Sequence, residues 1–183
     1  SLTPGGDVVS ASAVPTDATP FAPSVTPRAL SHEDILETIA AFGEATRRAI
    51  DAGFDGIELH EAHGFLIQNF LSPRFNQRSD QWGGSLENRM RFPLAVVAEV
   101  KRAAATAGRP FVVGYRISPE EPGIGGLRIA DVLVLTDRLV DAGVTYIHAS
   151  LSDVLTAKPL DSEGGKTIAT RFVERIAGRV PLI

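Results

Sequence analysis

The sequence contains no cysteine, and this absence removes several kinds of chemistry from the chain. Without a thiol it can form no disulfide and no thiolate nucleophile. It also cannot supply cysteine ligands to zinc or to an iron–sulfur cluster. A lack of cysteine is typical of cytoplasmic proteins, and we predict that location.

Long apolar runs and an excess of basic residues are absent as well. No apolar run approaches the ~18 residues that a membrane helix requires, and the first residues lack the pattern of a signal peptide. Lys and Arg number 18 against 22 Asp and Glu, which gives a formal net charge of −4. A basic surface for nucleic acid is therefore not expected. The sequence predicts neither a membrane nor a nucleic-acid partner.

What is present is the composition of an ordinary folded chain. Of the 183 residues, 44% are hydrophobic and 22% are charged, as in most globular proteins. The length suits one domain or a piece of a larger one. The chain lacks an initial Met and stops in the apolar run 180–183, which is typical of the start of a strand. We expect an internal fragment, and the alternative is a domain with a short terminal edge strand.

The chain divides into two segments by composition. Residues 1–30 are rich in proline and predict an extended loop. From residue 31 onward, a helix-ending glycine precedes a short apolar run four times, at Gly53, Gly108, Gly143 and Gly178. The last three glycines are spaced by 35 residues and the first two by 55. A period near 35 indicates strand–loop–helix units of a parallel sheet, with about 20 extra residues in the longer unit.

Two architectures accept this order of elements, an open doubly wound sheet and a (β/α)8 barrel. A barrel takes ~250 residues, so the chain would be about half of one. In both architectures ligands bind at the carboxyl ends of the strands. The candidate residues there are His60, His63, Arg116, His148 and Ser150. A loop over residues 71–89 follows the first strand end, and a long loop at that edge usually carries a function.

Each candidate also has a structural interpretation. Two histidines three residues apart at the mouth of a strand favour a ligand site. Arg116 lies in an apolar run and needs an acceptor-rich partner, either a ligand or Glu58 in an ion pair. The segment 60–63, H-E-A-H, is one residue short of the zinc motif H-E-x-x-H and leaves a strand, so we predict no metal site.

The charged residues of the long loop are expected to hold it in place rather than to catalyse. Trp82 is expected to serve the same purpose. The predicted pairs are Arg78 with Asp80 and Glu87 with Arg89.

Residues 53–92 read GFDGIELHEAHGFLIQNFLSPRFNQRSDQWGGSLENRMRF and closely resemble the Old Yellow Enzyme family of NADH:flavin oxidoreductases. The similarity continues more weakly through Arg116 and covers roughly residues 30–183. It implies an α/β fold, an FMN-binding (β/α)8 TIM barrel. Residues 31–183 would be a partial barrel of about four parallel strands with their helices, about the fourth to the seventh βα units. The resemblance decides between the two architectures, which the periodicity alone leaves open.

The resemblance also implies roles for four residues. His60 and His63 are similar to the catalytic pair that binds the carbonyl or nitro oxygen of a substrate, where two donors stabilise the charge that develops as hydride arrives. Arg116 is similar to the cofactor-binding arginine at the flavin N1/C2=O edge. Phe65 occupies a substrate-binding position where related ene-reductases have a proton-donating Tyr. Since Phe has no proton to give, solvent or another residue protonates the substrate, or the acceptor needs no such acid.

The implied activity is that of an FMN-dependent oxidoreductase, which passes hydride from NAD(P)H through the flavin to an electron-poor small molecule. The acceptor would be an activated alkene, a quinone or a nitro compound. Two alternatives stay open: the barrel part of a larger dienoyl-CoA-reductase-like iron–sulfur flavoenzyme, and a catalytically silent half-barrel that associates with itself. Because barrel phosphate sites follow the seventh and eighth strands, we expect residues 1–183 alone to bind FMN weakly. Open sheet edges predict a homo-oligomer.

Overall fold

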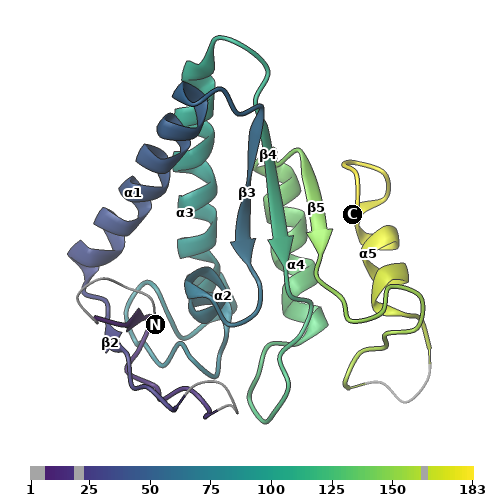
Figure 1. Ribbon diagram of the computed structural model, residues 1–183. Helices are drawn as coiled ribbons and strands as arrows, with labels where there is room; N and C mark the ends of the chain where they lie inside the picture. The colour runs from purple at the N-terminus through teal and green to yellow at the C-terminus, as the bar shows by residue number, and fades with distance from the viewer. Residues whose placement is uncertain (1–6, 19–22, 162–164) are drawn as a thin grey trace.

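The computed structural model describes residues 7–18, 23–161 and 165–183 (Figure 1). The elements of this described part are the strands β1 (Val9–Ser10), β2 (Arg28–Ala29), β3 (Gly56–Glu61), β4 (Val112–Ile117) and β5 (Tyr146–Ala149), and the helices α1 (His32–Asp51), α2 (Leu66–Leu71), α3 (Leu86–Ala104), the 3-10 turn η1 (Ala105–Ala107), α4 (Ile129–Asp141) and α5 (Ile168–Ile176).

The main sheet is parallel and follows the chain order β3-β4-β5. Beyond β5, Leu182 forms a parallel bridge to Ile147, and the amide of Ile183 donates to the Ile147 carbonyl at 2.9 Å. The apolar run at 180–183 thus begins to pair as a fourth strand. The prediction of parallel strands alternating with helices is confirmed, with three strands in the described sheet and an isolated bridge at Leu182.

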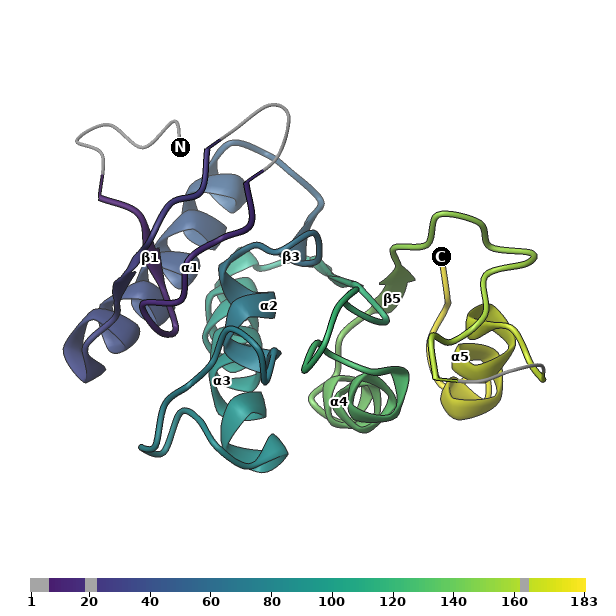
Figure 2. The same ribbon diagram turned by 90° about the horizontal axis from the view of Figure 1, so that it is seen from below.

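Helices cover one face of this sheet, with α1 packed along α3 and α4 beside α5 (Figures 1 and 2). The strand residues that point toward these helices are mostly apolar and buried, as in Leu59, Val113 and Ile147, and the exception is the buried carboxyl of Glu61 at the end of β3. Each large aliphatic side chain removed from water contributes about 1.5–3 kcal/mol. Burial on this side leaves the opposite face of the sheet, here called the open face, free for polar side chains.

The helix boundaries follow local signals in the sequence. The Ser31 side chain accepts from the backbone of Asp34, whose carboxylate accepts from the backbone of Ser31, so α1 begins with a capping box. The four glycines predicted after the helices all have positive φ, between 65° and 86°. Pro93 lies inside α3.

The N-terminal segment, predicted as an extended loop, also contains a parallel pairing of β1 with β2 that the sequence did not predict. Residues 1–6 and 19–22 of this segment lie outside the described residues. Arg78 of the long loop ties the segment down, because its Nη1 donates to the carbonyls of Ala11 and Leu30 at 2.9 and 2.6 Å. The segment and the long loop therefore pack as one layer.

The long loop is held much as predicted, with one correction. Arg78 pairs with Asp80, and Trp82 is buried with its Nε1 donating to His32 Nδ1 at 2.9 Å. The predicted pair of Glu87 with Arg89 is wrong. Both residues lie on α3 two positions apart, and such residues do not face each other on a helix. Arg89 instead donates to Asp131 of α4, to the carbonyl of Leu71 at the end of α2 and to the Gly84 carbonyl.

Within the described parts of the chain, no helix has both the length and the apolar character needed to cross a membrane.

Candidate active site

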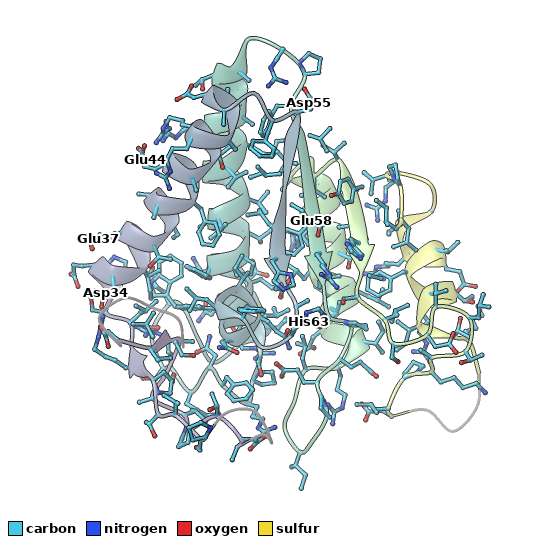
Figure 3. All side chains as sticks on the ribbon, viewed as in Figure 1. Asp34, Glu37, Glu44, Asp55, Glu58 and His63 are labelled. Carbon is cyan, nitrogen blue, oxygen red and sulfur yellow. The ribbon has the colours of Figure 1, made fainter. Side chains whose placement is uncertain are left out.

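Polar side chains form two rows across the open face. In the register of the sheet, His60 lies opposite Arg116, and Arg116 lies opposite His148. One layer toward the strand starts, Glu58 and Tyr146 flank Gly114. Figure 3 labels Glu58 in the middle of its strand and His63 beyond the strand end. The parallel register thus brings three sequence-predicted candidates, His60, Arg116 and His148, into one row.

The two predicted catalytic histidines come together. Their ring centroids are 5.2 Å apart with an interplanar angle of 75°. His60 ends the open-face row of β3, and His63 follows the strand in a tight turn with φ of 58°. Burial lowers the pKa of His60, and the positive charge of Arg116 lowers it further. His60 is therefore favoured as a neutral imidazole that can donate one hydrogen bond.

Ser150 connects His63 to Arg116. Its Oγ lies 2.7 Å from His63 Nε2 and accepts from Arg116 Nη2 at 3.0 Å. The Ser150 amide donates to the Ile117 carbonyl at 2.9 Å, which fixes the residue at the end of β4. The ends of β3, β4 and β5 therefore meet in one hydrogen-bonded group.

The ion pair of Arg116 with Glu58, one of the two interpretations of Arg116, does not form. Glu58 Oε2 accepts from the Tyr146 hydroxyl at 2.9 Å and lies 3.1 Å from His148 Nδ1. Burial and the Glu58 carboxylate raise the pKa of Tyr146 to about 12. Arg116 Nε is buried and has no hydrogen-bond partner among the described residues. The guanidinium therefore keeps a free donor for an acceptor-rich ligand.

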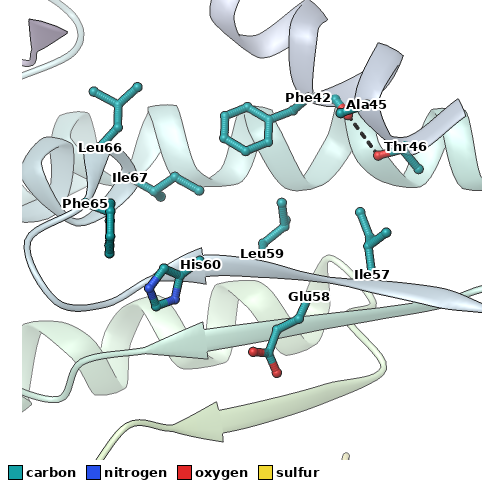
Figure 4. A pocket seen from close by; sticks show the side chains of 10 residues that line it. All are labelled: Phe42, Ala45, Thr46, Ile57, Glu58, Leu59, His60, Phe65, Leu66 and Ile67. Atoms are coloured by element: carbon teal, nitrogen blue, oxygen red, sulfur yellow. Dashed lines mark hydrogen bonds between the residues drawn. The ribbon is translucent and has the colours of Figure 1, made fainter. Parts of the chain in front are cut away.

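Phe65 lies beside the histidines. It occupies the N-cap position of α2, it is 58% exposed, and its ring centroid is 5.0 Å from that of His60. His60 and Phe65 line one end of a mainly apolar cavity of about 430 Å³ between α1 and β3, which Figure 4 shows from close by. His63 does not line this cavity. It lines a second one, of about 360 Å³, together with Gln68 and Ser118.

Some residues of the site were not singled out from the sequence. The Ser118 hydroxyl accepts from the His63 amide, and the buried Gln68 side chain accepts from the Gly64 amide. Gln68 in turn donates to Glu121 at 2.7 Å. The only sequence signal for Ser118 and Glu121 is their position just after a strand end. No group of three or more metal-ligating side chains suited to a metal ion is found among the described residues.

A parallel sheet with helices on one face and converging polar residues at its strand ends defines a ligand-binding βα unit. The family model described as "NADH:flavin oxidoreductase / NADH oxidase family" matches residues 4–177. The chain belongs to this family, and the resemblance inferred from residues 53–92 is confirmed. The match also extends further toward the N-terminus than the predicted residue 30.

Curated relatives and solved structures agree with this assignment. The chain is 50% identical to a probable NADH-dependent flavin oxidoreductase, YqiG, of Bacillus subtilis over 85% of this chain and 42% of the relative. It is 46% identical to an NADH:fumarate oxidoreductase of Klebsiella pneumoniae over 85% of this chain and 17% of the relative. Morphinone reductase, solved with tetrahydroNAD, has a TM-score of 0.72 and 30% identity over 95% of this chain and 48% of its own. The chain thus spans less than half of the length of these proteins.

Proposed function

We propose that the chain is part of an FMN-dependent oxidoreductase that takes hydride from NAD(P)H and passes it to an electron-poor small molecule. The observation that carries the proposal is the group formed by His60, His63 and Arg116 at the strand ends. We further propose that residues 31–183 form about the fourth to the seventh βα units of a (β/α)8 barrel, preceded by an extended, proline-rich segment over residues 1–30. Support comes from the similarity to about half of morphinone reductase.

The residues present fit a flavin. Arg116 combines a fixed positive charge with a buried Nε that has no partner among the described residues, which suits the acceptor edge of a flavin ring. When bound, FMN would supply the hydride-transfer chemistry that protein side chains lack. Arg116 would hold the N1/C2=O edge, and its charge would favour the reduced anion. We assign no residue of this chain to the FMN phosphate.

The histidines would bind and polarise the acceptor. His60 is held neutral by burial and by the charge of Arg116, so it donates a hydrogen bond without carrying charge into the site. A second donor from His63 on the same oxygen would stabilise the negative charge that develops during reduction. Phe65 would contact the apolar part of the acceptor. Fumarate, which the name of the Klebsiella relative gives, is an activated alkene, and this supports an alkene as the acceptor class.

The test uses the protein at its full natural length, reconstituted with FMN. We expect NADH or NADPH to bleach the flavin without oxygen, and an activated alkene, quinone or nitro compound to restore its colour. His60→Ala and His63→Ala should each slow this re-oxidation roughly 10- to 100-fold, as expected for the loss of a donor to a developing charge. His32→Asn, which keeps an acceptor for Trp82 Nε1, is the control. A protein that binds no FMN, or whose flavin no nicotinamide reduces, would refute the proposal.

A larger enzyme is the second candidate, since the chain covers only 17% of the Klebsiella relative and 20% of histamine dehydrogenase from Rhizobium sp. 4-9, which is 36% identical with a TM-score of 0.68. This unit therefore also occurs within much longer polypeptides. The mass of the natural polypeptide and an iron determination would distinguish an iron–sulfur flavoenzyme from a single barrel. We also propose a cytoplasmic homo-oligomer, and light scattering of the purified protein tests its oligomeric state.

A further inference from the structure

The turn that carries His63 has an unfavourable backbone conformation. His63 has φ of 58° and Gly64 has φ of 76°. Glycine adopts such angles freely, but a residue with a Cβ does so only where the surrounding structure holds it. Two side chains fix the turn in this conformation. The His63 amide donates to Ser118 Oγ at 3.1 Å, and the Gly64 amide donates to Gln68 Oε1 at 3.0 Å.

The amide of Gln68 can satisfy this turn in only one orientation. Its Oε1 accepts from a backbone N–H, so its Nε2 must find an acceptor elsewhere. That acceptor is Glu121 Oε1, at 2.7 Å. The Gln68 side chain is buried, with 3% exposure, and a rotated amide would place its NH₂ against the Gly64 N–H.

Glu121 is buried too, with 5% exposure, and the hydrogen-bond partners of its carboxylate are all donors. Besides Gln68, the Ser72 hydroxyl and the Leu127 amide donate to its Oε2, the latter at 3.0 Å. Among the described residues, no Lys, Arg or His forms an ion pair with this carboxylate, and Arg128 donates only to the Glu121 backbone carbonyl. Burial of a carboxylate without a cation opposes folding. The three hydrogen bonds offset that cost, and they make the carboxylate the common partner of Gln68, Ser72 and Leu127.

The hydrogen-bond donors around position 121 explain why a carboxylate, rather than an amide, occupies it. The carboxylate meets donors on both oxygens, which a neutral amide cannot do. In Glu121→Gln, an NH₂ group would face either Gln68 Nε2 or the Leu127 N–H. The Leu127 N–H belongs to the backbone and cannot turn away. The NH₂ group at position 121 would therefore face Gln68 Nε2. To avoid this contact between two donors, the Gln68 amide would rotate and leave the Gly64 N–H without its acceptor.

We propose that Glu121 is a positioning residue for His63, which it orients through the Gln68 amide and the Gly64 N–H. This inference rests on the proposed function, because the position of His63 affects ligand binding only if His63 contacts the acceptor. Glu121 lies 58 positions after His63 in the sequence, and the hydrogen bonds of its carboxylate go to Gln68, Ser72 and Leu127 and not to a histidine ring.

The test is a swap of the two side chains in the full-length, FMN-loaded protein. Glu121→Gln creates the donor conflict, and the double variant Gln68→Glu/Glu121→Gln removes it again. In the double variant, the carboxylate introduced at position 68 still accepts from the Gly64 amide. The amide introduced at position 121 donates its NH₂ to that carboxylate, and its carbonyl oxygen accepts from Ser72 and Leu127.

Three measurements separate positioning from a general loss of structure. They are the Kd of FMN, the ring signals of ¹⁵N-labelled histidines, and the Kd, read from the flavin spectrum, of a para-substituted phenol, whose oxygen would replace the acceptor oxygen at the two histidines. In Glu121→Gln we expect phenol binding to weaken roughly 3- to 10-fold, as for one lost hydrogen bond. FMN binding should stay within about 2-fold by the same reasoning, since no contact of Arg116 changes. The His63 ring signals should shift while those of His32 stay in place, and the swap should restore both readouts.

Each outcome decides the inference. If Glu121→Gln leaves the His63 signals and the phenol Kd at wild-type values, or if the swap is no better than the single variant, the inference is overturned. Other results would contradict the proposed function itself. In that case the phenol would not bind the wild type, or would bind His63→Ala normally. The His63 signals would then still show whether Glu121 positions this residue.

Discussion

Replacement of Phe65 by Tyr tests whether the site lacks a proton donor. Phe65 is 58% exposed and its ring centroid lies 5.0 Å from that of His60, so the added hydroxyl would lie near the region where we propose that the acceptor binds. The exposure also means that the hydroxyl stays hydrated and meets no packed core. We therefore expect the free energy of unfolding to change by less than about 0.5 kcal/mol.

The effect on rate should be much larger than the effect on stability. General acid catalysis by a positioned side chain typically contributes roughly 10²–10⁴-fold, which corresponds to about 3–5 kcal/mol of barrier. An enone needs a proton at its α-carbon when it is reduced, whereas a quinone oxygen can take its proton from water. Phe65→Tyr should therefore speed re-oxidation of the flavin by an enone and leave re-oxidation by a quinone near the wild-type rate.

The assay is stopped-flow re-oxidation of the reduced flavin in the full-length protein, with a cyclic enone and a quinone in parallel. Phe54→Tyr is a matched control, because Phe54 is 62% exposed but precedes the start of β3, at the opposite end of the strand from His60. An unchanged enone rate in Phe65→Tyr would refute the proton-donor argument. An equal gain for both acceptors would also refute it, since the hydroxyl would then act by some means other than protonation.

Three further predictions concern individual side chains. Arg116→Lys keeps the charge but loses the planar fork, and it should weaken FMN binding roughly 10-fold in a fluorescence titration; an unchanged Kd would contradict the assigned contact. Arg78→Met removes two carbonyl contacts and the Asp80 pair and should cost about 2–4 kcal/mol in urea unfolding, whereas the exposed Arg102→Met should stay within about 0.5 kcal/mol. Burial raises the pKa of Glu61 well above its ordinary value of 4.5, so the folded state holds a proton that the unfolded chain releases. Stability should therefore fall by about 1.4 kcal/mol per pH unit above about pH 4.5, until the folded pKa is reached, and a Glu61→Gln variant with the same slope would show that this carboxyl is not the cause.

The repeat of βα units could be predicted because its signals are local. A glycine with positive φ after a helix, followed by an apolar run, depends on a few neighbouring residues, and all four such sites were placed correctly. The pairing of β1 with β2 was missed because each strand has only two residues, too short for any alternating pattern. A distant side chain, Arg78, donates to the Ala11 and Leu30 carbonyls next to this pairing, and no local pattern reveals that contact.

The candidate site was also predictable only in part, because local patterns do not reveal contacts between distant residues. The proximity of His60 and His63 follows from their spacing at one strand end, and the position of Arg116 beside them follows from the parallel register. The contact of Gln68 with Glu121 joins residues 53 positions apart on a helix and a loop. Nothing in either local sequence specifies that the two side chains meet. Sequence patterns therefore located the groups proposed to bind the ligand but not the groups that hold them.

The partners of Glu58 bear on what Arg116 can bind. From the sequence, Arg116 had two possible partners, a ligand or Glu58. Glu58 is instead engaged by the Tyr146 hydroxyl and by His148, one layer toward the strand starts. Arg116 is left with the neutral Ser150 hydroxyl as its hydrogen-bond acceptor among the described residues. A half-buried guanidinium whose charge no carboxylate neutralises favours an anionic or electron-rich ligand. The engagement of Glu58 therefore supports the proposal that Arg116 binds the flavin.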